Sequence, residues 1–409
     1  MVKPNPGEAS LPLDSAGNTM SLKSNARSLI KLSALLCANA CADELNVPQS
    51  IKFENGLTFT PYLQTSERYD DNFREVERHP DASWITSLTP SFNLASNDGK
   101  RAYKLSYKAD SDIFESSHKD DNTDHYLDGT AGFDFNARNR LKLEAGYKKV
   151  EETATLDQHL ENDKYTFSHL GGMYTYGART ARGQLELSAD YSQMRYQNSD
   201  GINNDKERDA TALIGTLYFK VAPNTRALVE TRWTQFEYVS NKKLDNDTVA
   251  LLGGLSWDAT ANTTGTVKLG AERKLYDDPA VGDKGGSLWE VGVDWKPRSY
   301  STFSLKTHHQ LDEGTDGASA IDNLTTSLDW EHEWLDRLST VASYSYTTKD
   351  YQDDAERQDK INRYGFLVKY QMRRWLGFDI GYRHGKEKST FADESFERNI
   401  YKFSVTATL

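Results

Sequence analysis

Apolar and polar residues alternate along this chain in runs that recur about every twenty residues from Gly56 to Leu409. Each run ends in a break, and the breaks are alternately short and long. Strict alternation predicts β-strands with one apolar and one polar face. Long antiparallel strands with such connections are typical of transmembrane β-barrels. The pattern predicts an all-β, antiparallel outer-membrane β-barrel of about 18 strands (about 16–18), with short periplasmic turns and longer extracellular loops.

The breaks also give the expected topology. Eight tight breaks are rich in Gly, Asn, Asp, Pro or Arg and serve as the predicted periplasmic turns: residues 96–100, 136–139, 177–183, 222–225, 260–263, 296–299, 335–337 and 373–375. Nine wider, acid-rich breaks are the predicted extracellular loops: residues 70–82, 115–124, 152–164, 197–209, 240–248, 277–287, 311–323, 349–360 and 386–398. This arrangement places both ends of the barrel domain on the periplasmic side.

The polar half of each strand must face water, because a charge facing lipid at mid-membrane costs roughly 2–4 kcal/mol. In residues 140–148, for example, Leu141 and Leu143 alternate with Lys142 and Glu144. The same phase gives a set of candidate lumen-lining residues: Lys104, Lys108, Lys142, Lys148, Arg226, Arg232, Lys268, Glu290, Asp294, Lys306, Arg363, Lys369, Arg373 and Arg383. For any one of them, pairing with a charge on a neighbouring strand is the simpler explanation.

Aromatic residues gather near both ends of the predicted strands. Those beside the predicted periplasmic turns are Trp257, Trp295, Trp334 and Trp375, and those approaching the outer loops are Tyr69, Tyr107, Tyr147, Tyr238, Tyr276, Tyr346 and Tyr382. Trp and Tyr favour the membrane interface because their rings are apolar at one end and polar at the other. We therefore predict two aromatic girdles in the same register as the turns.

Among the classes of membrane protein, the composition fits a β-barrel and does not fit a helical bundle. The mean hydropathy of −0.73 excludes a helical membrane protein, but a barrel shows only every second strand residue to lipid. A soluble solenoid or propeller is the alternative, which the regular alternation of turn lengths disfavours. The net charge is −12, and no basic stripe suggests a nucleic-acid partner.

The first residues predict export. Met20 is followed by basic residues, an apolar run and the small-residue site Ala40-Cys41-Ala42, so residues 1–42 are expected to be a leader and signal peptide with translation starting at Met20. Lipidation of Cys41 is the alternative. Residues 43–55 would be a short periplasmic segment and 56–409 the barrel. The short segment cannot supply a plug domain, so transport is expected to be passive or driven from the periplasmic side.

Catalytic and metal-binding patterns are weak. Residues 118–125, with His118, Asp120, Asp121, Asp124 and His125, are the best candidate for a hydrolase site at the outer rim. The acid-rich runs of the outer loops, which would bridge lipopolysaccharide phosphates through a cation, do not match the ligand spacing of a calcium loop. We predict no enzyme activity, no cofactor and no metal.

The first hairpin carries a more specific signal. Residues 67–73 (ERYDDNF) are followed by residues 84–90 (WITSLTP) and a third strand from Arg101. This order resembles the putative β-barrel porin family associated with exopolysaccharide biosynthesis and export, whose first hairpin carries a YDDN and then a T-P strand. One departure is the final residue, Leu409, where such barrels commonly end in an aromatic residue.

The resemblance implies a Gram-negative outer-membrane channel that exports an exopolysaccharide or capsule-like polymer. Its expected partners are outer-membrane lipid and lipopolysaccharide, the polysaccharide, periplasmic export or synthesis components and the barrel-assembly machinery. Two alternatives remain open. One is a general or sugar-selective uptake porin, which the shortness of the predicted loops disfavours because uptake porins usually fold a long loop into the lumen. The other is an outer-membrane hydrolase or surface adhesin.

Overall fold

The computed structural model describes residues 50–153, 161–199, 201, 203–260, 262–315, 317–353, 357–391 and 394–408. The predicted signal peptide, with Met20, Cys37 and Cys41, lies outside the described residues. Within these ranges, the chain forms no helix whose length and apolar character would let it cross a membrane.

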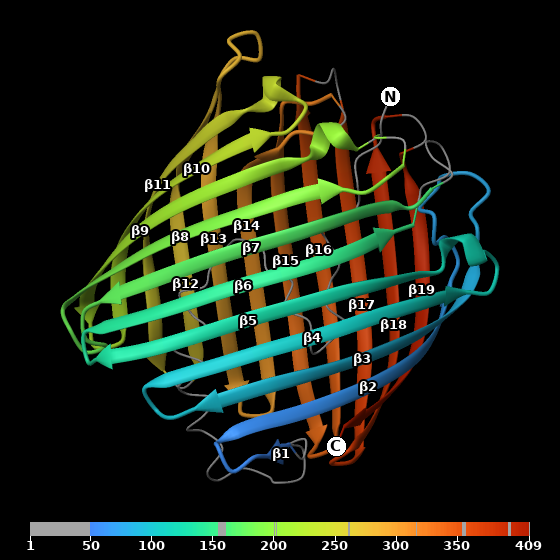
Figure 1. Ribbon diagram of the computed structural model, residues 1–409, viewed down its shortest axis with the longest axis horizontal. Helices are drawn as coiled ribbons and strands as arrows, with labels where there is room; N and C mark the ends of the chain where they lie inside the picture. Colours follow the sequence, from blue (N-terminus) through green and yellow to red (C-terminus); the bar gives the residue numbers. More distant parts are fainter. Residues whose placement is uncertain are drawn as a thin grey trace.

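The described residues form one antiparallel sheet of nineteen strands (Figure 1). The first ten are β1 (Ile51–Lys52), β2 (Leu57–Asp70), β3 (Ser83–Asn97), β4 (Arg101–Phe114), β5 (Asn122–Asn136), β6 (Asn139–Glu152), β7 (Asp163–Tyr176), β8 (Gly183–Tyr196), β9 (Arg208–Ala222) and β10 (Thr225–Tyr238). The others are β11 (Asn246–Thr260), β12 (Thr263–Tyr276), β13 (Lys284–Arg298), β14 (Ser301–Glu313), β15 (Ala320–Leu335), β16 (Leu338–Gln352), β17 (Gln358–Arg373), β18 (Leu376–Ser389) and β19 (Phe396–Thr408).

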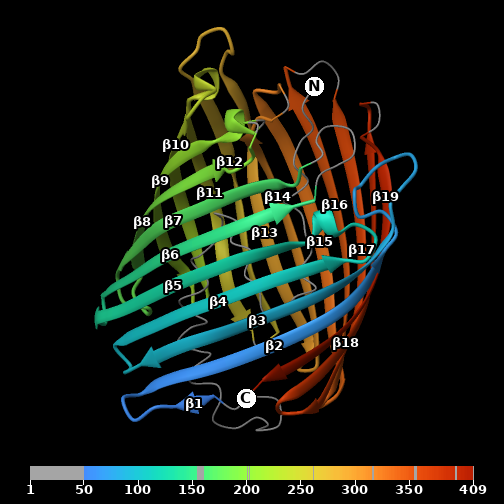
Figure 2. The same ribbon diagram turned by 45° about the vertical axis from the view of Figure 1, so that its right-hand side comes forward.

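Pairing of β19 with β2 closes the sheet into a barrel. The paired residues run from Ile400 opposite Asp70 to Thr408 opposite Tyr62. Below Tyr62, the short β1 pairs with the same edge of β2, with Ile51 opposite Phe59. Figure 2 shows β2 and β19 meeting at one side of the barrel, with β1 below them. The predicted fold is therefore confirmed: a closed barrel of eighteen strands, with β1 as one strand more.

The two ends of the barrel differ as the sequence predicts. Every odd-numbered strand from β3 to β17 is joined to its successor by one of the eight tight connections, and we name this side the turn end. The nine wider connections form the opposite side, the loop end. Three of them contain a short 3₁₀ turn: η3 (His118–Asp120), η4 (Asn204–Lys206) and η5 (Lys242–Leu244).

Strands extend further into the loop end than the sequence pattern indicates. Residues 386–389 belong to β18 and residues 396–398 to β19, although both lie in a predicted loop, and the same holds for the ends of β14 and β16. Charged residues hide the apolar alternation there. Backbone hydrogen bonding does not require that alternation, so the ladder continues where the side chains are polar.

Candidate functional site: the polar interior of the barrel

Side chains of the barrel alternate between an exposed apolar face and an enclosed polar face. On β6, Leu143 and Tyr147 are 41% and 45% exposed, whereas Lys142, next to Leu143, is 6% exposed. On β12, Leu269 is 60% exposed and Lys268 is 7% exposed. The exposed set is large and aliphatic or aromatic on almost every strand. The outer surface therefore suits lipid, and the polar positions line the interior.

The candidate lumen-lining residues can now be placed on this wall. Thirteen of the fourteen occupy interior positions by strand alternation, on β4, β6, β10, β12, β13, β14, β17 and β18. Arg373 is the exception, because it is exposed at the last position of β17, beside a tight turn. The structure does not gather the fourteen into one site; it distributes them around the circumference.

One group of these residues forms a compact ionic network on the wall of β10, β12 and β13. Arg232 donates to Glu230 at 2.6 Å and to Glu290 at 2.7 Å. Lys268 bonds Glu230 at 2.8 Å and lies 3.5 Å from Glu290. The side chains are only 4–14% exposed. We call these four residues the ionic lattice; its two positive and two negative charges are all paired.

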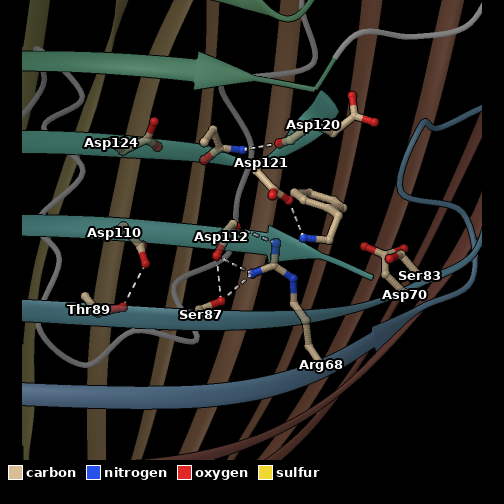
Figure 3. Close-up of polar contacts among 12 residues, drawn as sticks. Arg68, Asp70, Ser83, Ser87, Thr89, Asp110, Asp112, Asp120, Asp121 and Asp124 are labelled. Carbon is tan, nitrogen blue, oxygen red and sulfur yellow. Dashed lines mark hydrogen bonds and ion pairs between the residues drawn. The ribbon is translucent and has the colours of Figure 1, made fainter. Parts of the chain in front are cut away.

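The wall of β2 to β5 carries a second set of polar contacts, shown in Figure 3. Arg68 reaches across β3 to Asp112 at 2.6 Å, and Ser87 donates to the same carboxylate at 2.5 Å. Thr89 donates to Asp110 at 2.7 Å. Two hydroxyl groups and one guanidinium thus donate hydrogen bonds to carboxylates on this wall.

Residues 118–125 do not converge on a catalytic site. Asp120 is buried in an ion pair with Arg74, and Asp121 accepts a hydrogen bond from the backbone N–H of Phe114. Asp124 accepts from Tyr126 and from the N–H of Glu151 on the interior face, whereas His125 is on the opposite face of β5 and bonds Tyr107. These carboxylates hold strand ends and loops. Among the described residues, no group of three His, Cys, Asp or Glu side chains is arranged to hold a metal.

The YDDN motif locks the closure of the barrel. Asp70, fully buried, accepts hydrogen bonds of 3.0 Å from Arg398 of β19. Asp71 accepts from the backbone N–H of Asn399 at 2.6 Å and from its side-chain amide at 2.7 Å. Asn72 donates to the carbonyl of Glu397 at 2.9 Å. Each of these three residues therefore ties the end of β2 to β19.

The connection that follows the motif, residues 71–82, packs against the loop-end parts of the strands beside β2. Phe73 packs with Ile85 and Phe114, both on interior positions. Arg74, 4% exposed, pairs with Asp120 in the next connection, and Glu75 pairs with Arg398 of β19 at 2.6 Å. The connection thus ties together the loop ends of neighbouring strands.

The family of the chain follows from its sequence. The family described as "Putative beta-barrel porin 2" matches residues 56–409. The chain belongs to this family. The match covers the whole barrel, and it agrees with the resemblance stated for the first hairpin. The protein is accordingly a porin-like outer-membrane β-barrel.

Solved structures similar to this barrel are outer-membrane proteins of low sequence identity. OpdK of Pseudomonas aeruginosa, solved with vanillate, has 12% identity and a TM-score of 0.47, with 86% of this chain and 98% of that chain covered. OccK2 (OpdF) of the same organism has 9% identity and a TM-score of 0.49, with coverages of 88% and 99%. The FrpB iron transporter of Neisseria meningitidis has 11% identity and a TM-score of 0.48. The match covers 82% of this chain and 64% of the FrpB chain. No curated protein sequence matches the chain.

The aromatic girdles of this porin-like barrel need one correction. At the turn end, Trp295, Trp334 and Trp375 are each 50–54% exposed, as a girdle requires. At the loop end, Tyr238 and Tyr276 are buried on interior positions; Tyr238 donates to Glu313 and Tyr276 to the carbonyl of Ser319. Their positions along the strands suit a girdle, but they share the phase of the interior residues. Placing them in the girdle was wrong.

Sequence reasoning missed an aromatic cluster inside the barrel. Tyr126, Tyr165, Phe167, Met194 and Tyr196 lie together on β5, β7 and β8, around Val150 of β6. The ammonium group of Lys148 lies 5.1 Å from the ring centre of Phe167. Phase is the signal that would have revealed the cluster, because Tyr126 shares the face of Asp124 and Asp128.

Proposed function

We propose that the barrel is a passive outer-membrane channel for hydrophilic, hydroxyl-rich solutes, with carbohydrates as the solute class. The observation that carries this proposal is an eighteen-strand barrel whose interior positions hold polar and charged side chains. Barrels of about 16–18 strands are wide enough to leave an aqueous channel. Mixed charges, hydroxyls and amides exchange hydrogen bonds with water and sugar hydroxyls at little net cost.

Two directions of transport fit this channel. Export of an exopolysaccharide or capsule-like polymer is favoured by the YDDN hairpin, whose resemblance is to a family associated with that process. Uptake of sugars is favoured by the mixed polar and charged interior, which exchanges hydrogen bonds with small hydrophilic solutes as readily as with a polymer. In both cases we assign the turn end to the periplasm and the loop end to the outside, by the convention of outer-membrane barrels.

Reconstitution tests the channel itself. Purified protein in a planar bilayer should give stepwise conductance that maltohexaose interrupts in a concentration-dependent manner. A barrel without conductance, or one that maltohexaose never blocks, would contradict the proposed solute class.

Deletion of the gene separates the two directions. Loss of secreted polymer with unchanged growth on oligosaccharides would favour export. Normal polymer with slower uptake of radiolabelled maltohexaose would favour uptake and exclude export as the main activity.

A further inference from the structure

A row of basic and apolar side chains crosses the interior wall from β4 to β9, strands that lie side by side in Figure 1. Each member pairs in register with the next, in the order Lys108, Tyr126, Lys148, Phe167, Met194 and Arg208. We call these six residues the cation–aromatic row. Because the strands of a barrel are tilted and staggered, such a row rises as it winds around the wall. Lys108 lies near the middle of β4, whereas Arg208 is the first residue of β9 at the loop end.

The row is accessible from the channel. All six residues occupy interior positions by strand alternation, and each is partly exposed. The side chain of Lys108, for example, is 25% exposed. Since an interior side chain does not face lipid, its exposed part faces the lumen, where a passing solute can touch it.

Lys148 is held in this row by aromatic rings. Its ammonium nitrogen lies 5.1 Å from the ring centre of Phe167 and 5.5 Å from that of Tyr165. Within the part of the chain that the structure describes, Lys148 forms no hydrogen bond or salt bridge, although Asp128 lies within electrostatic range. A ring attracts a cation but has no net charge, so the rings position the ammonium group without neutralising it. Its three N–H donors therefore remain available to a solute.

The arrangement of the row fits a chain of acidic sugars. Lys108 and Lys148 are two strands apart, which is about 10 Å across the sheet. The ammonium group of Lys108 lies 4.5 Å from the ring centre of Tyr126, so rings accompany both lysines. A polymer of uronic acids likewise combines carboxylates with the C–H faces of pyranose rings. The negative face of an aromatic ring suits such C–H groups, and an ammonium group suits a carboxylate.

We propose that the cation–aromatic row is a binding track for an acidic carbohydrate. Lys148 pairs with the carboxylate of a uronic acid, while the sugar ring lies against the exposed parts of Phe167 and Met194. Hydrogen bonds between charged groups are stronger than those between an ammonium group and a neutral hydroxyl, so the track favours acidic over neutral sugars. This track rests on the proposed function and deepens it, because it names the class of carbohydrate and the residues that select it.

The test compares block of single channels by hexagalacturonate and by maltohexaose in planar bilayers. Both probes are hexasaccharides, but only hexagalacturonate carries a carboxylate on each ring. We expect half-block of the wild-type channel by hexagalacturonate at a concentration about tenfold lower than by maltohexaose, the value of one charge-assisted hydrogen bond. Lys148→Met should reduce this preference to about twofold or less and leave block by maltohexaose unchanged. Unchanged single-channel conductance shows that the variant barrel is assembled.

Lys306→Met is the matched control for the loss of a positive charge. Lys306 of β14 also occupies an interior position, but its neighbours in register are Gly292 and Ser327, so no ring lies beside it in the row. This variant should keep the preference for hexagalacturonate within about twofold of the wild type. A loss equal to that of Lys148→Met would show that the preference comes from the total charge of the lumen and would overturn the track.

Phe167→Leu tests the aromatic part of the track. Leucine keeps an apolar side chain at this position but removes the ring, so block by both probes should weaken about threefold. Unchanged block by both probes would show that the sugar does not lie against Phe167, and the track would then be wrong.

The outcomes separate failure of the track from failure of the proposed function. If maltohexaose blocks the wild-type channel and hexagalacturonate blocks it no better, the track is wrong and the channel proposal stands. If neither probe blocks a conducting channel, carbohydrates are the wrong solute class and both proposals fail. Block by hexagalacturonate alone would support the track and overturn the wider class of hydroxyl-rich solutes.

Discussion

The ionic lattice on β10, β12 and β13 and the surroundings of Arg363 on β17 both place basic side chains on the interior wall, and they differ in how completely these side chains are bonded. In the lattice, Arg232 and Lys268 share the carboxylates of Glu230 and Glu290. Within the described residues, Arg363 forms no hydrogen bond through Nη1, and Gly385 of β18 lies opposite it in register. A charge on the wall of the barrel therefore holds neighbouring strands together where its partners are complete, and it contributes less to stability where they are not.

Arg398 sharpens this comparison most, because it lies in register two strands away from Arg363 and donates from all three of its nitrogens to Asp70 and Glu75. Arg398→Met would leave the buried carboxylate of Asp70 without this partner and would release Glu75. We expect the free energy of unfolding to fall by about 4 kcal/mol, measured by urea unfolding in lipid vesicles with tryptophan fluorescence. A variant as stable as the wild type would show that the Asp70 contact does not hold the closure.

Arg232→Met tests the lattice alone. Removing the guanidinium leaves one positive charge for two mostly buried carboxylates, and we expect a loss of about 3 kcal/mol in the same unfolding measurement. Block by maltohexaose should remain within about twofold of the wild type, since a fully paired network offers the solute no free bond. A loss of less than about 1 kcal/mol would remove the distinction between the two regions.

Arg363→Met tests the opposite case. Since Nη1 of Arg363 has no hydrogen-bond partner among the described residues, removal of this group should change the free energy of unfolding by less than about 1 kcal/mol. A stability loss close to that of Arg232→Met would mean that Arg363 is bonded as fully as the lattice.

The smallest effect concerns a charged contact in the loops. Hydrogen bonds from Lys284 and Ser319 hold the pKa of Asp353 below its usual value. A carboxylate with a lowered pKa in the folded protein adds stability above its unfolded pKa, near about 3.9, and that stability is lost as the pH falls through the lower folded value. We expect the protection of the Ser319 and Asp353 amides against hydrogen exchange, relative to their intrinsic exchange rates at each pH, to fall only in that acidic range. Asp353→Asn should remove this acid dependence.

Alternation along the chain was enough to predict the barrel, because lipid on one face and water on the other impose a period of two on every strand. Turn residues such as Asn97, Asp98 and Gly99 located the tight connections, since their conformations are local. The same alternation would have placed Tyr238 and Tyr126 on the interior face of the barrel. Tyrosine is, however, also the residue type expected in an interfacial girdle or in a core.

The closure of the barrel has no comparable local signal. It depends on contacts such as that of Glu75 with Arg398, which lie far apart in the sequence. The YDDN motif was visible as a resemblance, but its partners Arg398 and Asn399 lie 328 residues away from Asp70 and Asp71, so only the closed barrel shows what the motif does. Periodicity reveals the faces of strands; it does not reveal which distant strands meet.

The bonds of the YDDN motif also bear on how this barrel assembles. Each of β3 to β19 can pair with the strand before it through a short connection, whereas β2 and β19 must meet across more than three hundred residues of chain. If the hairpins are already formed, joining these ends still costs roughly 2–3 kcal/mol more in loop-closure entropy than joining neighbours. Closure is then the step with the least local help and the last to be made. The three consecutive polar residues Asp70, Asp71 and Asn72 act as a latch that turns an open sheet into a ring.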